Sequence, residues 1–162
     1  MRRVVACGTV AALTGCAAMM PEPVAPLTPA QSRALVMDAA AEIVSTLNLP
    51  VVRAAFWHSS CNDQGQAPFR GQVRITYPAA GTAEGSESQI GDMIRQLTDT
   101  GWSADPGFHS HSPVLRKSGI TAILRDRNAS VPTRAVEVLG ECREVTERRQ
   151  LDERPQWIDL PE

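Results

Sequence analysis

Residues 69–77 carry the pattern that most restricts the fold of this chain. Apolar or small residues occupy the odd positions, and polar or charged residues occupy the even positions Arg70, Gln72, Arg74 and Thr76. Because successive side chains of a β-strand point to opposite faces, this segment predicts a strand with one buried face and one wet face. Such a strand is typical of an antiparallel sheet covered on a single side. The rest of the chain must therefore supply the cover.

Two segments have the periodicity of amphipathic helices. Residues 29–48 repeat apolar side chains every three or four positions, and Thr28 with Gln31 predicts a capping box at the start of this helix. A second helix is predicted to start with a capping-box pattern at Ser86 and to end at Gly101. Either helix could cover the apolar face of the sheet.

Further extended segments complete the predicted domain. They are residues 51–57, 102–105, a hairpin formed by 114–116 and 120–125, and 134–139. We summarise the element order as α-β-β-α-β-β-β. This order predicts an α+β two-layer sandwich, in which an antiparallel sheet of four to five strands has both helices packed on one face.

The N-terminus has the organisation of a secretory signal peptide. Arginines at positions 2 and 3 precede an apolar run that ends in Leu-Thr-Gly-Cys at Cys16. This ending is similar to a bacterial lipobox, which predicts cleavage before Cys16 and a diacylglycerol on its thiol. A transmembrane helix is the alternative, but residues 4–20 are diluted with Ala, Gly and Thr, whereas a span needs about 20 strongly apolar residues. Two acyl chains suffice for stable anchoring, so we expect the mature chain on the extracytoplasmic face of the cell membrane.

The predicted cleavage divides the chain into four parts. Residues 1–15 form the signal peptide, 16–28 a proline-rich tether, 29–143 the α+β domain, and 144–162 a charged C-terminal tail that contains Trp157. Proline-rich tethers are semi-extended, so this one would hold the domain clear of the membrane.

The cysteine count predicts one disulfide. Cys7 leaves with the signal peptide and Cys16 carries the lipid, so Cys61 and Cys142 remain. Two thiols in an oxidising compartment most simply pair with each other. Metal ligation is the alternative, but neither cysteine has a Cys-x-x-Cys or Cys-x-x-His neighbour. We therefore expect no metal and no cofactor.

Two groups of residues invite a catalytic interpretation. His109 and His111 could hold a metal ion together with His58 or a carboxylate such as Asp105, but their Ser/Pro/Gly-rich surroundings are typical of a solvated loop. Ser59 and Ser60 beside His58 suggest a serine hydrolase, yet the chain has neither a Gly-x-Ser-x-Gly nor a Ser-x-x-Lys pattern. We assign no catalytic residue from the sequence.

The wet face of the central strand is rich in arginine. Arg70 and Arg74, with Arg125, Arg127 and Arg134 on neighbouring segments, predict a basic face for anionic lipid headgroups or an acidic partner. The alternative is a solvated face whose arginines pair with nearby carboxylates. With 16 basic and 18 acidic residues, the net charge of −2 argues against a nucleic-acid partner.

Several of these features together resemble a known family. They are the lipobox, the N-terminal helix, Trp57 before Cys61, Gly101-Trp102 after the second helix, Leu139-Gly140-Glu141-Cys142, and the tail Pro155-Gln156-Trp157. The combination is similar to the small actinobacterial lipoproteins of the mycobacterial LppA type. This resemblance implies an envelope lipoprotein with an α+β domain and one disulfide, and it supplies no catalytic residue.

The expected function is that of a non-enzymatic binding module anchored through Cys16. Its partner would be an envelope protein, lipid or glycan, and the predicted contact residues are Arg70, Arg74, His109 and His111. Two alternatives stay open. One is a small metal-dependent or serine hydrolase that uses the histidine loop; the other is a lipid or glycolipid carrier, which would need a large apolar cavity between sheet and helices.

Overall fold

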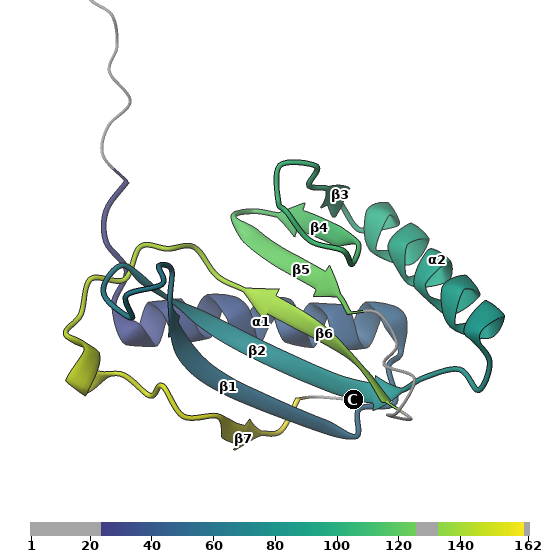
Figure 1. Ribbon diagram of the computed structural model, residues 1–162, viewed down its shortest axis with the longest axis horizontal. Helices are drawn as coiled ribbons and strands as arrows, with labels where there is room; N and C mark the ends of the chain where they lie inside the picture. Colours follow the sequence, from purple (N-terminus) through teal and green to yellow (C-terminus); the bar gives the residue numbers. More distant parts are fainter. Residues whose placement is uncertain (1–23, 126–132, 161–162) are drawn as a thin grey trace, which may run out of the picture.

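The computed structural model describes residues 24–125 and 133–160, and its elements form two layers (Figure 1). The helices are α1 (Pro29–Leu47) and α2 (Ala83–Asp99), with a short 3-10 helix η1 (Arg148–Gln150) near the C-terminus. The strands are β1 (Arg53–Ser60), β2 (Phe69–Pro78), β3 (Ser103–Ala104), β4 (Val114–Lys117), β5 (Ile120–Leu124), β6 (Thr133–Leu139) and β7 (Gln156–Ile158). The α+β two-layer sandwich is confirmed.

All strand neighbours are antiparallel, in the order β3-β4-β5-β6-β2-β1-β7. The predicted number of four to five strands is too low, because the described residues form seven strands. The additional pairing comes from two short edge strands. β3 has two residues, and β7 has three residues that lie in the segment predicted as a tail and pair with β1. β3 lies within the extended segment predicted at 102–105, whereas β7 has too few residues for an alternating pattern to be visible.

Helix α1 begins as predicted and packs closely on β2. The Thr28 hydroxyl accepts a hydrogen bond from the Gln31 N–H, and the Gln31 side chain accepts one from the Thr28 N–H, which completes the capping box. Gly71 allows the close approach, since a Cβ at this position would stand 2.6 Å from the Ser32 carbonyl oxygen. Because no Cβ is present, the Gly71 N–H can donate a hydrogen bond to the Ser32 hydroxyl at 2.7 Å.

Helix α2 starts four residues before the predicted position. Its N-cap is Thr82, whose hydroxyl accepts from the Gly85 N–H at 3.0 Å, and Glu84 stands in the first turn, where the helix dipole favours an acidic side chain. Ser86 was therefore wrongly predicted as the cap; it is buried inside the helix.

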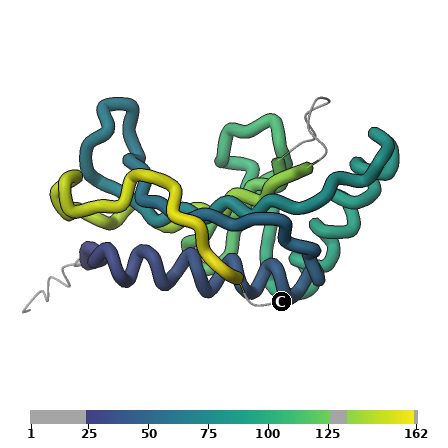
Figure 2. The backbone as a smooth tube through the Cα atoms, turned by 90° about the horizontal axis from the view of Figure 1, so that it is seen from below, coloured from purple at the N-terminus to yellow at the C-terminus, as the bar shows by residue number. Residues whose placement is uncertain are grey.

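The core fills the space between the helices and the sheet. Val36, Ala40 and Ile43 of α1 meet the odd-numbered residues of β2, and all of these side chains are fully buried. Met93 of α2 reaches the same layer, where it accepts a hydrogen bond from the Tyr77 hydroxyl. Figure 2 shows α1 running along one side of the sheet, while the other side is open between loops that rise from it.

Candidate functional site

The even-numbered residues of β2 point to the open side of the sheet, and the strand register arranges their neighbours in rows. One row starts at Arg125, which directly follows β5, and runs across β6, β2 and β1 as Ala135, Thr76 and Arg53. The next row runs as Ile123, Glu137, Arg74 and Ala55, and ends at Trp157 of β7. Because directly opposed residues share a face, these side chains form one continuous surface.

Small side chains at the centre of these rows leave a hollow of about 530 Å³, which we call the open-face groove. Its floor consists of Ala55, Thr76 and Ala135. Longer residues surround the floor: Arg53, Trp57, Arg74, Arg125, Thr133, Pro155 and Trp157. Ala55 and Ala135 are buried although they point to the open side, because these neighbours cover them.

A buried carboxylate holds two arginines together at the groove. Glu137 is 8% exposed, and its Oε2 lies 2.6 Å from Nη2 of Arg125 while its Oε1 lies 3.9 Å from Nη1 of Arg74. Each guanidinium has five N–H donors, so Glu137 occupies only part of their capacity. About half of each arginine side chain is exposed. The remaining donors are therefore available to an anion that enters the groove.

Arg70 lies on the same face but outside the groove, beside Ser59 of β1. Its Nε is buried and has no hydrogen-bond partner among the described residues. Burial lowers the pKa of the Arg70 guanidinium, while the carboxylate of Glu137 raises it. Arg70 thus adds positive potential to the face, whereas Arg74 belongs to the groove itself.

The C-terminal strap, residues 144–160, supplies one wall of the groove. The strap crosses to the edge of the sheet, where Trp157 pairs with Ala55 in the ladder. The Trp157 side chain is 67% exposed, and the guanidinium carbon of Arg53 lies 4.9 Å from its ring centre. The sequence does not predict this contribution, because the mixed charges and prolines of residues 144–162 indicate a tail. The only available signal was the short β-type run of Trp157 and Ile158 after Pro155.

Arg134 does not belong to the basic face as predicted. It stands opposite Tyr77 on the helix side of the sheet, it is 6% exposed, and its Nη1 donates to the Ser86 carbonyl oxygen at 2.8 Å. The strand pattern contained the signal, because Arg134 has the parity of the core residues Val136 and Val138. Arg127 lies outside the described residues.

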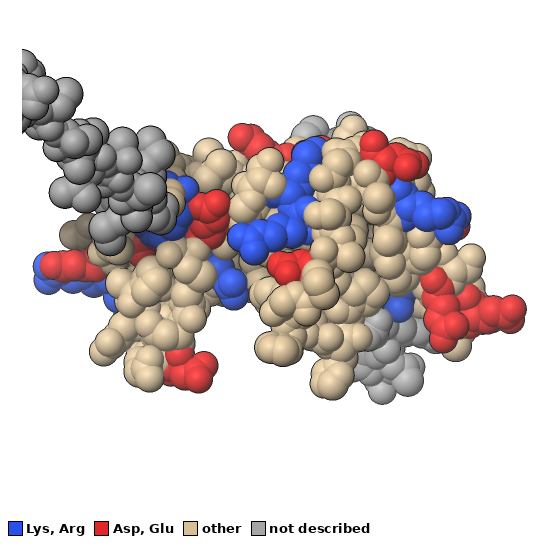
Figure 3. Space-filling model, turned by 90° about the horizontal axis from the view of Figure 1, so that it is seen from above, with Lys and Arg blue, Asp and Glu red and all other residues tan. Residues whose placement is uncertain are grey.

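Basic and acidic side chains lie interspersed on the side of the molecule shown in Figure 3. Ion pairs such as Lys117–Glu42, at 2.6 Å, and Arg116–Asp105, at 3.7 Å, neutralise charges one to one. The open-face groove differs from this pattern, because there two arginines share one carboxylate.

His109 and His111 are exposed in the loop that rises from the open side, and they do not line the open-face groove. The same loop places Phe108 over a small apolar cluster of Val114, Ile123 and Leu139. Within residues 24–125 and 133–160, no group of three or more His, Cys, Asp or Glu side chains is arranged to hold a metal ion. His58 does not join the loop histidines, since it is buried on the helix side.

His58 pairs with an acid instead. Its Nε2 lies 3.3 Å from Oε2 of Glu144, whose side chain is fully buried. Neither Nδ1 of His58 nor the Glu144 oxygens have a hydrogen-bond partner in the described part of the chain. Glu144 forms main-chain bridges with Leu27 and Phe69, so this pair lies where the N-terminal segment joins the domain.

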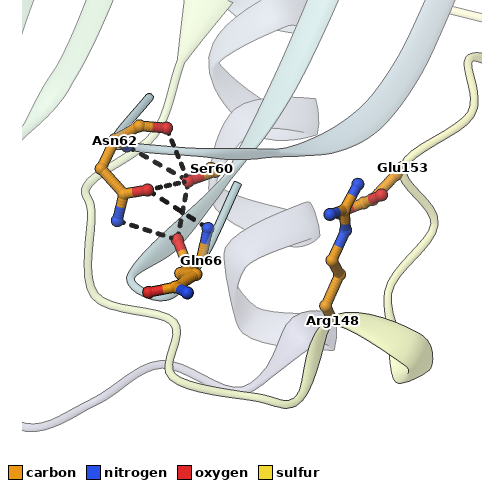
Figure 4. A network of polar contacts seen from close by, with 5 residues as sticks. All are labelled: Ser60, Asn62, Gln66, Arg148 and Glu153. Atoms are coloured by element: carbon orange, nitrogen blue, oxygen red, sulfur yellow. Dashed lines mark hydrogen bonds and ion pairs between the residues drawn. The ribbon is translucent and has the colours of Figure 1, made fainter. Parts of the chain in front are cut away.

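The two serines beside His58 do not complete a catalytic arrangement with it. Ser59 points to the opposite face of the strand. The Ser60 hydroxyl belongs to the β1–β2 turn, where it donates to the Gln66 carbonyl oxygen at 2.6 Å and accepts from the Asn62 N–H (Figure 4). The same view shows the Arg148–Glu153 pair, which braces the C-terminal strap at 2.7 Å.

A disulfide joins Cys61 and Cys142, 81 positions apart. It links the end of β1 to the start of the chain that leaves β6, next to the His58–Glu144 pair. Cys16 lies outside the described residues.

The comparisons with known proteins identify the family. The family model described as "Putative lipoprotein LppJ" matches residues 28–161. The chain belongs to the LppJ lipoprotein family. Its relatives of the same description in Mycobacterium tuberculosis, strains CDC 1551 and H37Rv, are 31% identical over 91% of this chain and 84% of theirs. The relative in Mycobacterium bovis is 31% identical over 87% of this chain and 81% of its own. No solved structure matches significantly.

The LppJ assignment agrees with the resemblance to mycobacterial lipoproteins, although the matching family is LppJ and not the LppA type. It supports a membrane-associated envelope lipoprotein at the level of the family, and the names of the LppJ relatives assign no reaction or ligand. Within the described ranges, no helix is long and apolar enough to cross a membrane.

Proposed function

We propose that this LppJ-family protein is a non-enzymatic binding module of the cell envelope and that its open-face groove binds an anionic ligand. The observation that carries the proposal is the pair formed by Arg74 and Arg125, which one buried carboxylate of Glu137 holds at the edge of a hollow. Guanidinium groups match carboxylates and phosphates in geometry as well as in charge, because they donate two parallel N–H bonds.

The net charge of the groove favours the same class of ligand. Arg53, Arg74 and Arg125 line it, while Glu137 is the acidic partner of the latter two. A concave site partly shielded from water strengthens such attractions compared with a flat, fully solvated face. An incoming anion would therefore neutralise the positive charge that the single carboxylate of Glu137 leaves uncompensated.

The alternatives have less support from the described residues. A hydrolase on the histidine loop would need His58, which is buried against Glu144 on the far side of the sheet. A lipid carrier would need an apolar chamber between the layers, and that space holds packed side chains such as Val36, Ile43 and Tyr77, each 0% exposed.

The anchor is the second part of the proposal. We expect cleavage after residue 15, a diacylglycerol on Cys16, and a tether over residues 16–28 that holds the domain on the extracytoplasmic face of the membrane. The end of the tether is attached to the domain, since the Leu27 N–H donates to the Arg143 carbonyl oxygen at 2.9 Å and the Arg143 side chain donates to the Ala25 carbonyl oxygen. The tether would thus hold the domain at the N-terminal end of α1.

Native mass spectrometry of the lipoprotein extracted from a bacterial envelope in mild detergent tests both parts. We expect a chain that begins at Cys16, carries acyl groups, and is two hydrogens lighter than the reduced form. An additional mass should be an acidic compound. The variant Arg74→Ala should lose it, whereas Arg95→Ala, which removes an exposed arginine paired with Asp92 on α2, should keep it.

Two results would refute the parts separately. A ligand retained equally by Arg74→Ala and Arg95→Ala would exclude the groove as its site. An unprocessed N-terminus, or a Cys16→Ala variant with the same acylation as the native chain, would exclude the anchor.

A further inference from the structure

The open-face groove offers more than positive charge. Trp57 of β1 and Trp157 of β7 stand on one side of it, and Arg74 of β2 and Arg125, which follows β5, stand on the other. In the row that contains Arg74, Ala55 and Trp157, the arginine and the indole are two strand spacings apart, which is about 10 Å. A ligand that contacts both must therefore carry its acidic group at one end and a flat, weakly polar surface at the other.

The tryptophan is positioned as a stacking surface. Two-thirds of the Trp157 side chain is exposed, which is unusual for an indole in a small domain. Arg53 lies 4.9 Å from its ring centre and holds the ring beside the hollow. Exposed indoles attract the C–H faces of sugar rings, while the ring N–H can still hydrogen-bond to a hydroxyl.

Hydroxyl groups are available between these two ends. Thr76 lies on the floor of the groove and Thr133 on its rim. Each provides one donor and two acceptor sites. Guanidinium donors for an acid, an indole for a ring face and threonines for hydroxyls are the three kinds of group that a sugar acid requires. The volume of about 530 Å³ is within the usual range of small-molecule sites.

We propose that the open-face groove binds a saccharide that bears a phosphate or carboxylate group. This inference rests on the proposed function and specifies its ligand. The acid would contact Arg74 and Arg125, and the sugar ring would lie against Trp157.

The location of the groove favours such a ligand over the surface of the anchoring membrane. The tether joins the domain at the start of α1, whereas Arg53 follows the end of that helix by six residues. A helix of 19 residues is about 28 Å long, so the groove lies roughly that far from the point of attachment. The concave shape likewise favours a small compound over the flat contact made by a folded protein partner.

The experiment uses the lipoprotein in detergent and four probes: glucose 1-phosphate, glucuronic acid, glucose and inorganic phosphate. Binding is measured by saturation-transfer NMR and by tryptophan fluorescence. Trp102 is 2% exposed in the core, so Trp57 and Trp157 should report the ligand. We expect at least one of the sugar acids to bind ten times more tightly than both glucose and inorganic phosphate. Comparison of the two acids then distinguishes a sugar phosphate from a uronic acid.

Variants separate the two ends of the site. Trp157→Ala should lower the affinity for the sugar acids about tenfold and leave the affinity for inorganic phosphate unchanged. Trp157→Phe should recover part of the lost affinity. Arg74→Ala should lower the affinity for the sugar acids and for inorganic phosphate, while Arg95→Ala serves as the matched control. Thermal unfolding of each variant checks that the fold is retained.

Each contrary result has a definite meaning. If inorganic phosphate binds as tightly as the sugar acids and Trp157→Ala affects neither, the saccharide inference is refuted and the proposed anion site stands. A polyglutamate peptide that binds more tightly than either sugar acid, and depends on Arg74, would also refute the saccharide. If none of the anions binds, both the inference and the proposed function fail.

Discussion

The disulfide provides the most quantitative test of the fold. Cys61 and Cys142 are 81 positions apart, so the bond closes a long loop in the unfolded chain. The loop-entropy relation gives about 4.5 kcal/mol of stabilisation for this length. For a domain of this size each kcal/mol corresponds to about 2–4 °C in Tm, so the double variant Cys61→Ala/Cys142→Ala should melt about 9–18 °C lower than the native protein.

Thermal unfolding followed by circular dichroism measures this difference. Cys142 is exposed and Cys61 partly so, which gives a reductant access to the bond. The reduced native protein should therefore melt near the double variant, and the double variant should not respond to reductant. A decrease of less than about 2 °C would refute the reasoning, because it would mean that the bond is not formed or that the loop ends stay together in the unfolded chain.

Three further predictions concern the buried side of the sheet. Gly71→Ala should cost about 1–3 kcal/mol in urea unfolding, since its Cβ would stand 2.6 Å from a main-chain oxygen of α1; Gly81→Ala, with nothing within 4 Å, is the control and should be near neutral. Glu144→Ala should cost about 1–3 kcal/mol because it removes a buried carboxylate that faces Nε2 of His58 and leaves this nitrogen only the Pro29 carbonyl oxygen at 3.4 Å, and the double variant His58→Phe/Glu144→Leu should be more stable than this single variant. Burial raises the pKa of Tyr77, so above about pH 10 the folded state binds more protons than the unfolded state and stability falls as pH rises; this fall should be smaller in Tyr77→Phe. Equal slopes between pH 10 and 11.5 would contradict the last prediction.

Local chemistry made much of the fold predictable. The capping box of α1 depends on two residues three positions apart, and the alternation in β2 depends on the geometry of a single strand. Such features need no knowledge of the rest of the chain. Where several local signals compete, the prediction is less accurate: both Thr82 and Ser86 can cap a helix, and in the structure Thr82 is the cap while Ser86 lies buried one turn inside the helix.

The groove could not be predicted in the same way. Arg74, Glu137 and Trp157 come from three separate strands, and they meet only because β2 lies between β6 and β1 and because β7 pairs with β1. Strand order depends on the packing of the whole domain, so spacing along the chain contains no direct signal for it. The alternation in β2 predicts which face of the sheet Arg74 is on, but it does not predict that Glu137 is the partner of Arg74.

The domain separates the parts that hold it together from the part that we propose for binding. The disulfide, the His58–Glu144 pair and the hydrogen bonds of Arg143 to the N-terminal segment all lie toward the start of α1. The groove lies toward the other end of this helix. Its longer side chains cover Ala55 and Ala135, which are buried on the open side of the sheet. Removing an exposed guanidinium or indole there uncovers little of the main core, so variants such as Arg74→Ala should change binding far more than stability. This separation allows the ligand site to be tested without unfolding the domain that carries it.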